Sequence, residues 1–535
     1  MTTNDSRYAD TAGRAVLQTL RAYGITTVFG IPGTHNLELY RPLSDLGIHA
    51  VTTRHEQGAG YAADGWGQQT GLPGVVITTS GPGLQNAMSA VGTAYCESRP
   101  LIVLSPGAPL GQEFGDRGSL HETKDASGMA GAVAEWSRRV ASAAEAVQAV
   151  HDAFELFRTA RPRPIHIEIP LDVLEGPARV PSAAREARPT PPPAAGDPDA
   201  VARAAALLAT AANPVVIAGG GATRATAEVT ALAERLRAPV LTTLNGKGTV
   251  DERHALSLGA NLRLPAPRAV AEASDVLLVL GSKLGEAELW VPALRPGGRV
   301  VRVDVSADQL QKNLAADVAV QGDVAAVVTA LLSALPDRGG AATPDLSTAR
   351  AETAAQIVEA LPATVELGAR IVEALPDDAI VAGDSSQIVY LAVANQLRQA
   401  RPHSMLYMPT YATLGYGLPA AIGARVADPT RPVVTVTGDG ALMFCVNELA
   451  TAVEQRLDLT VVCVDNGGYA EIKQNERDRG IPPIGVDLVQ PDWAALATAF
   501  GARGTRVESG ADVGAAIRAA VEAGGVHLVH VRQEA

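Results

Sequence analysis

Short apolar runs rich in β-branched residues recur along the chain, and each ends in glycine or a small polar residue. They lie at 27–30, 74–80, 101–105, 214–219, 276–281, 433–438 and 460–464. Alanine-rich stretches of helical length alternate with them. Continuous apolar runs are typical of strands buried on both faces, so the pattern predicts an α/β fold with doubly wound parallel sheets. Ligands of such sheets bind at the carboxyl ends of the strands.

Two segments without periodicity divide this pattern. Residues 176–198 are rich in proline and are expected to be an extended, semi-rigid linker, and residues 335–347 resemble a second connector. The division predicts three domains, at 1–178, 199–334 and 350–535. Each is long enough for one α/β sheet with its helices.

Composition narrows the class of function. The 535 residues are 47% hydrophobic and include 52 glycines, which is typical of a globular α/β protein with many tight turns. The formal net charge of −13 argues against nucleic acid as a partner and leaves a small-molecule substrate as the expectation.

The cysteines and the N-terminus bear on the compartment. Cys96, Cys445 and Cys463 match no metal-ligand spacing, and we expect them to be reduced. Residues 1–13 are polar and lack the apolar core of a signal peptide, and no apolar run is long enough for a membrane helix. The sequence therefore predicts a cytoplasmic protein without membrane contact.

Polar side chains follow two of the predicted strands. Asp439 stands between two glycines after the strand at 433–438, and Asn466 follows the strand at 460–464. Their oxygens are ligands that Mg²⁺ prefers, and Mg²⁺ usually shares its coordination sphere with phosphate. Gly440 would let the backbone approach that phosphate closely, and a helix expected after Ala441 would direct its positive end toward it. The segment thus predicts a magnesium site that anchors a diphosphate.

The spacing of these residues carries a family resemblance. Asn466 follows Asp439 by 27 positions, and the segment resembles the thiamine diphosphate binding motif. The resemblance implies a third metal ligand, the backbone carbonyl of Gly468. The cofactors implied are thiamine diphosphate and Mg²⁺, in the family of acetolactate synthase and the 2-oxo acid decarboxylases.

The family also requires a glutamate beside the aminopyrimidine of the cofactor. Glu56 lies in the segment Thr53–Gly65, after a strand-like run and at the start of a helix rich in glycine and alanine. The resemblance implies that Glu56 shares a proton with this ring and so activates the cofactor. The alternative is a surface glutamate favoured by the dipole at a helix N-terminus.

Further cofactor contacts are implied by the same resemblance. The segment at 74–86 looks like the turn along the pyrimidine ring, and the one at 411–420 looks like the segment between pyrimidine and thiazolium. Ile388 replaces a histidine that is common in the family, which puts that contact in doubt. The residues expected to contact cofactor are Pro82, Gly83, Asn86, Ser386, Gln387, Ala412, Leu414, Gly440, Ala441 and Tyr469.

The resemblance covers the whole chain. It implies a pyrimidine-binding domain, a middle domain and a diphosphate-binding domain, in that order. It also implies a homodimer or homotetramer in which Glu56 and Asp439 of one active site come from different subunits. FAD in the middle domain is neither supported nor ruled out by the sequence, and a yellow colour of the purified protein would reveal it.

Two segments are expected to line the substrate pocket. His121 and Glu122 stand near the position where decarboxylases carry a histidine pair, and His121 is either a proton relay or an ordinary loop histidine. Glu471 precedes by one position the catalytic glutamate of pyruvate-type decarboxylases, so it faces either another part of the substrate or solvent. His35 is either above the substrate or part of a turn.

The reaction is left with two alternatives. The cofactor adds to the carbonyl of a 2-oxo acid and accepts electrons as carbon dioxide departs. The resulting enamine is then protonated to an aldehyde or joined to a second carbonyl compound. The segments around His35, His121 and Glu471 look most like those of the 2-ketoarginine (5-guanidino-2-oxopentanoate) decarboxylases, and the alternative is a carboligase of the acetolactate synthase type.

Overall fold

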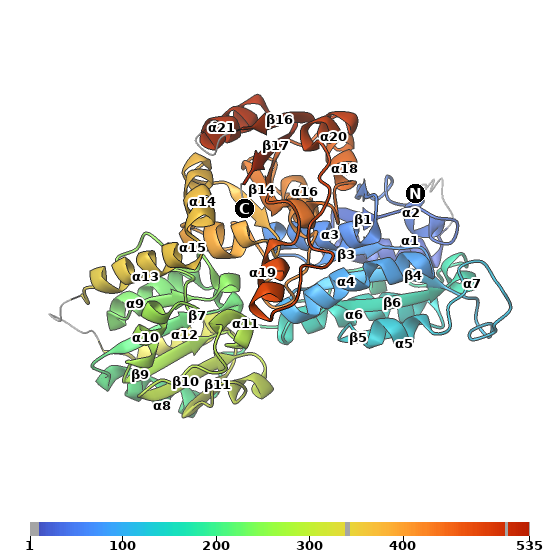
Figure 1. Cartoon of the computed structure of the whole chain (residues 1–535). Coiled ribbons are helices and arrows are strands. Elements are labelled where there is room, and N and C mark those ends of the chain that lie inside the picture. Colours follow the sequence, from blue (N-terminus) through green and yellow to red (C-terminus); the bar gives the residue numbers. More distant parts are fainter. Residues whose placement is uncertain (1–9, 337–342, 509–511, 534–535) are drawn as a thin grey trace. The chain divides into compact units, whose positions relative to one another are not determined.

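A computed structural model describes residues 10–336, 343–508 and 512–533. They form two compact units, shown as ribbons in Figure 1. Unit 1 runs to residue 191 and also contains residues 418–430 and 445–457, and unit 2 contains the remainder. The first nine residues and positions 337–342 of the predicted second linker lie outside the described residues.

Unit 1 is built on a six-stranded parallel sheet with the order β2-β1-β3-β4-β6-β5. Its strands are β1 (Thr27–Gly30), β2 (His49–Thr52), β3 (Gly74–Ile77), β4 (Leu101–Gly107), β5 (Trp136–Arg139) and β6 (Ile165–Pro170). Its helices are α1 (Ala12–Ala22), α2 (Leu37–Tyr40), α3 (Glu56–Thr70), α4 (Pro82–Glu97), α5 (Ala126–Gly131), α6 (Ala143–Thr159), α7 (Leu171–Leu174), most of α16 (Gly417–Ala427) and α18 (Glu448–Glu454), with a 3₁₀ turn η1 (Ser182–Arg185).

Unit 2 contains two parallel sheets. The five-stranded sheet has the order β11-β10-β9-β7-β8. Its elements are α8 (Pro198–Thr210), β7 (Pro214–Ala218), η2 (Gly220–Ala222), α9 (Thr226–Leu236), β8 (Val240–Thr242), η3 (Leu244–Gly246), α10 (Pro265–Glu272), β9 (Val276–Leu280), α11 (Glu286–Leu289), β10 (Arg299–Asp304), η4 (Ala307–Leu310), β11 (Val318–Gln321) and α12 (Val324–Ala334).

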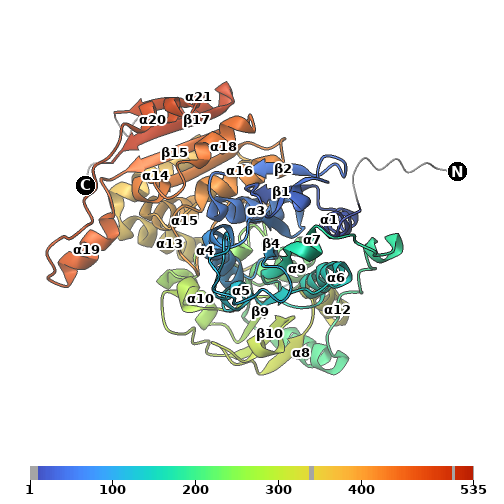
Figure 2. The same cartoon turned by 90° about the vertical axis from the view of Figure 1, so that its right-hand side faces the viewer.

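The second sheet of unit 2 has six strands in the order β13-β12-β14-β15-β17-β16, and Figure 2 shows β15 beside β17. Its elements are α13 (Ser347–Ala360), α14 (Pro362–Ala374), β12 (Ile380–Gly383), the π-helix η5 (Ile388–Val393), α15 (Ala394–Gln396), β13 (Met405–Leu406), β14 (Val433–Gly438), α17 (Asp439–Leu442), β15 (Leu459–Asp465), α19 (Ala470–Asp478), α20 (Trp493–Ala499), β16 (Arg503–Val507), α21 (Val513–Ala523) and β17 (Val526–Arg532).

Alternate side chains of a strand enter two separate cores. In β7, Val216 and Ala218 pack with α9 and α12 residues, whereas Val215 and Ile217 pack into a second cluster with Leu277. This is the arrangement of a doubly wound sheet, in which both faces are covered. The predicted α/β class with three doubly wound parallel sheets is therefore confirmed. The domain boundaries themselves stay a prediction.

The predicted helix start after Ala441 is wrong. α17 begins at Asp439 itself and ends at Leu442. Gly438 has extended backbone angles and donates its N–H to Ser386 Oγ, so it serves as the residue before the helix. An acidic side chain in the first helical turn is favoured by the backbone dipoles, which is why the short helix can begin at Asp439.

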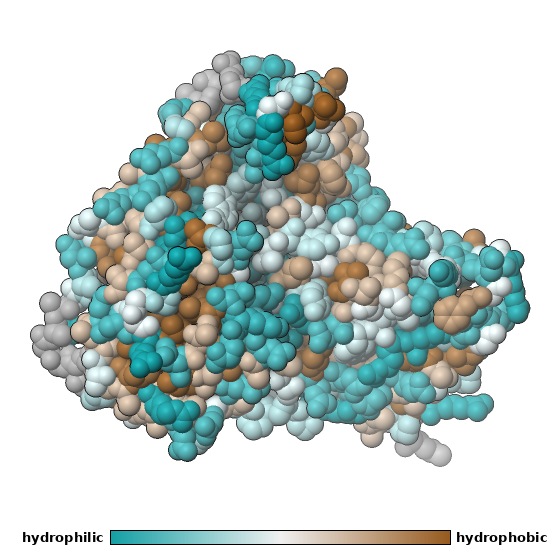
Figure 3. All heavy atoms as spheres, turned by 60° about the horizontal axis from the view of Figure 1, so that its bottom comes forward, coloured by the Kyte–Doolittle hydropathy of each residue, from teal (hydrophilic) through white to brown (hydrophobic). Residues whose placement is uncertain are grey.

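No helix of the described residues is both long and apolar enough to span a membrane. On the face shown in Figure 3, hydrophilic and hydrophobic residues are interspersed.

Candidate active site

Glu56 occupies a buried position at the start of α3 in unit 1. His55 precedes the helix with extended backbone, and its side chain accepts the Gln57 N–H. Only 6% of Glu56 is exposed. The alternative of a surface glutamate at a helix end therefore does not apply.

Three residues surround the Glu56 carboxylate. Asn86 Nδ2 donates to Glu56 Oε2 at 2.9 Å. At Gly83, an added Cβ would lie 3.0 Å from Glu56 Oε1, so glycine keeps the space beside this oxygen open. Burial, and then the negative charge of Glu56, raise the pKa of Tyr40. The structure thus places three predicted cofactor contacts together, since Pro82 is the first residue of the helix that carries Gly83 and Asn86.

Two histidines from separate loops contact the turn between β3 and α4. His35 Nδ1 is 2.6 Å from Ser80 Oγ, and His121 Nδ1 is 3.4 Å from Thr79 Oγ1. Their ring centroids are 5.2 Å apart in an edge-on arrangement. Burial, and then the charge of His121, lower the pKa of His35. The structure therefore pairs His121 with His35 from a distant loop.

Glu122 is turned toward its own loop. Its carboxylate accepts the backbone N–H groups of Arg117, Gly118 and Ser119 at distances between 2.7 and 3.2 Å. The Arg117 N–H is the largest of several causes that lower the pKa of Glu122. Glu122 is thus an ionised group that shapes the loop on which His121 stands with a positive φ of 58°.

Three polar groups of unit 2 converge at the ends of β14 and β15. The Asn466 side-chain amide lies 3.2 Å from Asp439 Oδ1 and 3.0 Å from the Gly468 carbonyl oxygen. If the amide nitrogen faces these atoms, it donates to both; if the amide oxygen faces them, three oxygens share a space that only a cation would stabilise. This is the ligand set expected for Mg²⁺.

Asp439 is a buried carboxylate without a cationic partner among the described residues. It is 2% exposed, and its Oδ2 has no hydrogen-bond partner among the described residues. Burial, and then the negative charge of Asp465, raise the pKa of Asp439 to about 6. A divalent cation would satisfy the orphaned oxygen and remove this penalty. The residues present therefore fit a metal.

The backbone around Asp439 and Asn466 requires glycine at two positions. Gly468 has φ of 137°, and an added Cβ would lie 2.2 Å from the Val486 carbonyl oxygen. At Gly440, a Cβ would lie 2.8 Å from the Tyr469 ring. Both predicted cofactor contacts, Gly440 and Tyr469, are thus packed together beside Asp439. The described part of the chain contains no group of three or more His, Cys, Asp and Glu side chains that could hold a metal, and the set proposed here combines one carboxylate with an amide and a backbone carbonyl.

A buried aspartate behind this corner was not predicted. Asp384 accepts hydrogen bonds from Ser386 Oγ at 2.6 Å and from Thr437 Oγ1 at 2.7 Å. Ser386 Oγ in turn accepts the Gly438 N–H at 2.9 Å. Burial raises the pKa of Asp384 to about 6. This hydrogen-bond network connects the end of β12 to the turn that carries Asp439. Ser386 bonds to both sides of it.

The other predicted cofactor residues of unit 2 occupy loops and element ends. Gln387 immediately precedes the π-helix η5. Ala412 is exposed and has a positive φ of 52°, and Leu414 is half-buried on the same loop. Ala441 is buried in α17.

Glu471 is held by a residue that sequence reasoning missed. The Tyr390 hydroxyl donates to Glu471 Oε2. No described residue donates to the other carboxylate oxygen. Although part of the side chain is exposed, loss of solvent around the carboxylate raises the pKa of Glu471. The two residues are 81 positions apart and carry no shared motif, so no local signal in the sequence indicated the pair.

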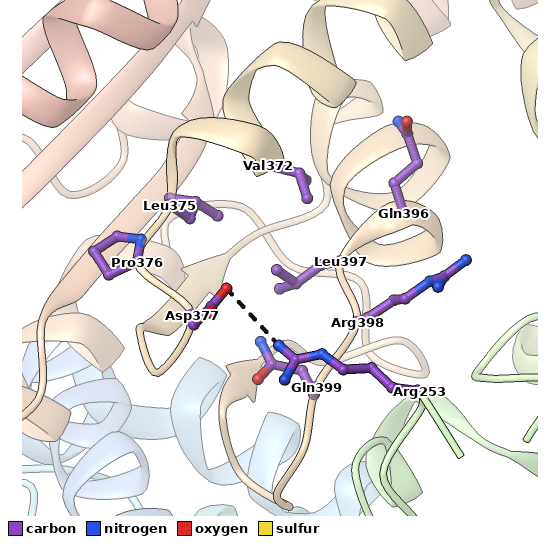
Figure 4. A pocket seen from close by; sticks show the side chains of 9 residues that line it. All are labelled: Arg253, Val372, Leu375, Pro376, Asp377, Gln396, Leu397, Arg398 and Gln399. Carbon is purple, nitrogen blue, oxygen red and sulfur yellow. Dashed lines mark ion pairs between the residues drawn. The ribbon is translucent and has the colours of Figure 1, made fainter. Parts of the chain in front are cut away.

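A separate pocket of unit 2 is lined by none of the predicted site residues. Arg253 and Asp377, 3.9 Å apart, lie at its rim (Figure 4). The remaining lining residues are Val372, Leu375, Pro376, Gln396, Leu397, Arg398 and Gln399. It is not the predicted cofactor site.

Comparison with known families assigns all three sheets. Residues 10–129 match the N-terminal TPP binding domain of thiamine pyrophosphate enzymes, residues 201–331 match their central domain, and residues 388–531 match their C-terminal TPP binding domain.

Relatives match over nearly the full chain. A probable 2-ketoarginine decarboxylase of Pseudomonas aeruginosa is 38% identical over 98% of this chain and 94% of its own length. Acetolactate synthase isozyme 1 large subunit of Escherichia coli is 30% identical over 100% of this chain and 96% of its own length. A probable acetolactate synthase large subunit of Methanocaldococcus jannaschii is 30% identical over 97% and 91%. These matches show that the chain belongs to the family of thiamine diphosphate-dependent enzymes.

Proposed function

We propose that the protein decarboxylates a 2-oxo acid with a cationic end, 5-guanidino-2-oxopentanoate, to the corresponding aldehyde. The observation that carries the proposal is Glu471, a carboxylate three residues beyond the metal-site carbonyl of Gly468, with one oxygen held by Tyr390. The 38% identity to a probable 2-ketoarginine decarboxylase supports the same substrate.

Each half of the candidate site has its own task in this proposal. When bound, thiamine diphosphate would supply a carbon nucleophile and an electron sink for decarboxylation. Glu56, oriented by Asn86, would share a proton with the aminopyrimidine. Asp439, Asn466 and the Gly468 carbonyl would hold Mg²⁺, which would anchor the diphosphate.

The histidine pair and Glu471 act on the substrate. His35 and His121, whose rings meet edge-on, transfer protons to and from the substrate. Glu122 orders the loop that carries His121. Glu471 pairs with the guanidinium, because a cation that leaves water without a counter-charge costs several kcal/mol.

The test is the substrate preference of Glu471→Gln. Losing a charged contact costs about 2 kcal/mol, so kcat/KM for 5-guanidino-2-oxopentanoate should fall roughly 30-fold. The fall for 2-oxopentanoate, which lacks the charge, should be much smaller. Asp478→Asn, which removes an exposed carboxylate from the same helix, is the matched control and should leave both values unchanged.

Other outcomes point elsewhere. Equal losses for the two substrates would make Glu471 a proton-transfer group instead of a selectivity group. A wild-type preference for pyruvate with an acceptor over both substrates would favour the carboligase alternative. The similarity to acetolactate synthases is the reason to test it.

A further inference from the structure

Tyr390 joins Glu471 to an aromatic surface of unit 2. Its hydroxyl donates to Glu471 Oε2, and its ring meets the Trp290 ring edge-on, with centroids 6.2 Å apart and planes at 69°. The Tyr390 side chain is 9% exposed. It belongs to the π-helix η5, a rare element that occurs frequently at functional sites. The Tyr390 side chain therefore contacts both the Glu471 carboxylate and the Trp290 indole.

Arg263 holds the backbone at Tyr390. Its Nη2 donates to the Tyr390 carbonyl oxygen and to Asn395 Oδ1. Its guanidinium also lies over the Trp290 ring, 4.6 Å from the centroid. Because Arg263 is only 6% exposed, its side chain has little conformational freedom. The backbone of η5 and the orientation of the indole are thus set by the same group.

Trp290 ends α11 and leaves much of its indole exposed. It adopts the left-handed backbone of a helix C-cap, with φ of 53°, and its N–H donates to the Glu286 carbonyl oxygen. The residue is 49% exposed. A half-exposed indole is a good surface for a planar cation.

The charged side chains around Tyr390 include one carboxylate without a cationic partner among the described residues. Arg263 is a cation and would by itself repel a guanidinium. Burial lowers the pKa of Arg263, and Tyr407 and then the carboxylate of Glu288 act in the opposite direction. Lys473, on the same helix as Glu471, is paired with Asp487 at 2.5 Å. Glu471 is therefore the carboxylate of this cluster whose charge is not balanced by a neighbouring cation.

We infer that Tyr390 is a positioning residue that selects for a cationic substrate end. Its hydroxyl holds Glu471 Oε2, which leaves Oε1 to accept from a guanidinium, and its ring supports the exposed Trp290 indole. Arg263 keeps this arrangement rigid. The inference rests on the proposed function, because it concerns the substrate end that Glu471 is proposed to bind.

The test is Tyr390→Phe, which removes the hydroxyl and keeps the ring. We expect kcat/KM for 5-guanidino-2-oxopentanoate to fall about 10-fold relative to that for 2-oxopentanoate, as for a lost hydrogen bond to a charged group. Binding of the unreactive pair 5-guanidinopentanoate and pentanoate to the holoenzyme, measured by calorimetry, should lose the same discrimination. Tyr95→Phe, on an exposed tyrosine of unit 1, should change neither measurement.

A double-mutant cycle separates positioning from general damage. If Tyr390 acts through Glu471, Tyr390→Phe adds no further loss of discrimination in the Glu471→Gln background. Additive losses, or a Tyr390→Phe variant that discriminates like wild type, would overturn the inference. A wild-type enzyme that does not prefer the guanidino compounds would instead overturn the proposed function.

Discussion

At the scale of single residues, the two ends of the cofactor are expected to meet carboxylates with opposite requirements. Glu56 already has a donor, Asn86, on one oxygen and open space beside the other. Asp439 is buried with an oxygen that no described residue satisfies. We propose that the first shares a proton with the cofactor and that the second binds a cation.

Replacing Glu56 with Gln should separate activation of the cofactor from its binding. The amide cannot take up the proton, so hydrogen–deuterium exchange at C2 of bound cofactor should slow by orders of magnitude. Calorimetric affinity for thiamine diphosphate and the thermal unfolding temperature should change little, because the shape is preserved. An unchanged exchange rate would remove Glu56 from its proposed role.

Asp439→Ala should lose Mg²⁺ and diphosphate together. The metal is held jointly by protein and phosphate oxygens, so affinity for thiamine diphosphate should weaken by at least ~100-fold, about 2.7 kcal/mol. Calorimetric titration measures it directly. Wild-type affinity in this variant would refute the metal site.

Stabilisation by Mg²⁺ should depend on pH through Asp439. The pKa of this carboxyl is raised from 3.8 to about 6, so the metal-free folded protein binds this proton more tightly than the unfolded chain. That contribution to stability is complete below pH 3.8 and is lost as pH rises through about 6. Above pH 6 Mg²⁺ replaces the proton and offsets the buried charge.

The increase in Tm on adding Mg²⁺ should therefore be larger at about pH 7.5 than at about pH 5. Asp439→Asn removes the titrating group and is the control, in which the two increases should be small and similar. Equal increases at both pH values in the wild type would contradict this account.

At the scale of elements, close helix packing fixes the half of the site that carries Glu56. α3 bears that residue, and α16 approaches it so closely that a Cβ at Gly423 would lie 1.8 Å from the Ala62 carbonyl oxygen. Glu448 of α18 accepts the backbone N–H groups of Arg54 and His55, which precede α3. Elements from the last third of the sequence therefore position a residue of the first.

Gly423→Ala should destabilise unit 1. Overpacking of a tight interface costs about 1–3 kcal/mol, and backbone atoms on both sides leave little room to relax. Thermal unfolding of the variant should occur at a lower temperature than that of Gly285→Ala, where nothing lies within 4 Å of the added Cβ and φ is not positive. Equal stability of the two variants would show that α16 is not held against α3.

The sequence allowed the strands and the motif residues to be predicted, because both leave local signals. β1 and β14 have the predicted bounds, and the carboxyl ends of β14 and β15 bring Asp439 and Asn466 together as expected. The start of α17 was misplaced, since a glycine on each side of Asp439 hides the helix boundary. The π-helix and the Tyr390–Glu471 contact depend on tertiary packing and left no local pattern.

At the scale of the whole molecule, the two halves of the candidate site lie in different units. Glu56 belongs to unit 1 and Asp439 to unit 2. The family resemblance implies that the halves of one site come from different subunits, and we propose that the active enzyme is an oligomer.

Mixing two inactive variants tests this arrangement. Glu56→Gln and Asp439→Ala subunits, when unfolded and refolded together, should regain activity, because a mixed dimer contains one site with both carboxylates. Random pairing should restore roughly a quarter of wild-type activity. The variants refolded separately and then combined are the control. No recovery above that control would place both residues in the same subunit's site.

Product analysis of the wild-type holoenzyme tests the central claim most directly. The enzyme should be supplied with 5-guanidino-2-oxopentanoate, 2-oxopentanoate and pyruvate, each with and without an acceptor aldehyde. We predict carbon dioxide and free 4-guanidinobutanal in equal amounts from the first compound, at the highest kcat/KM, whether or not the acceptor is present. A hydroxyketone as the main product, or pyruvate as the preferred substrate, would contradict the account.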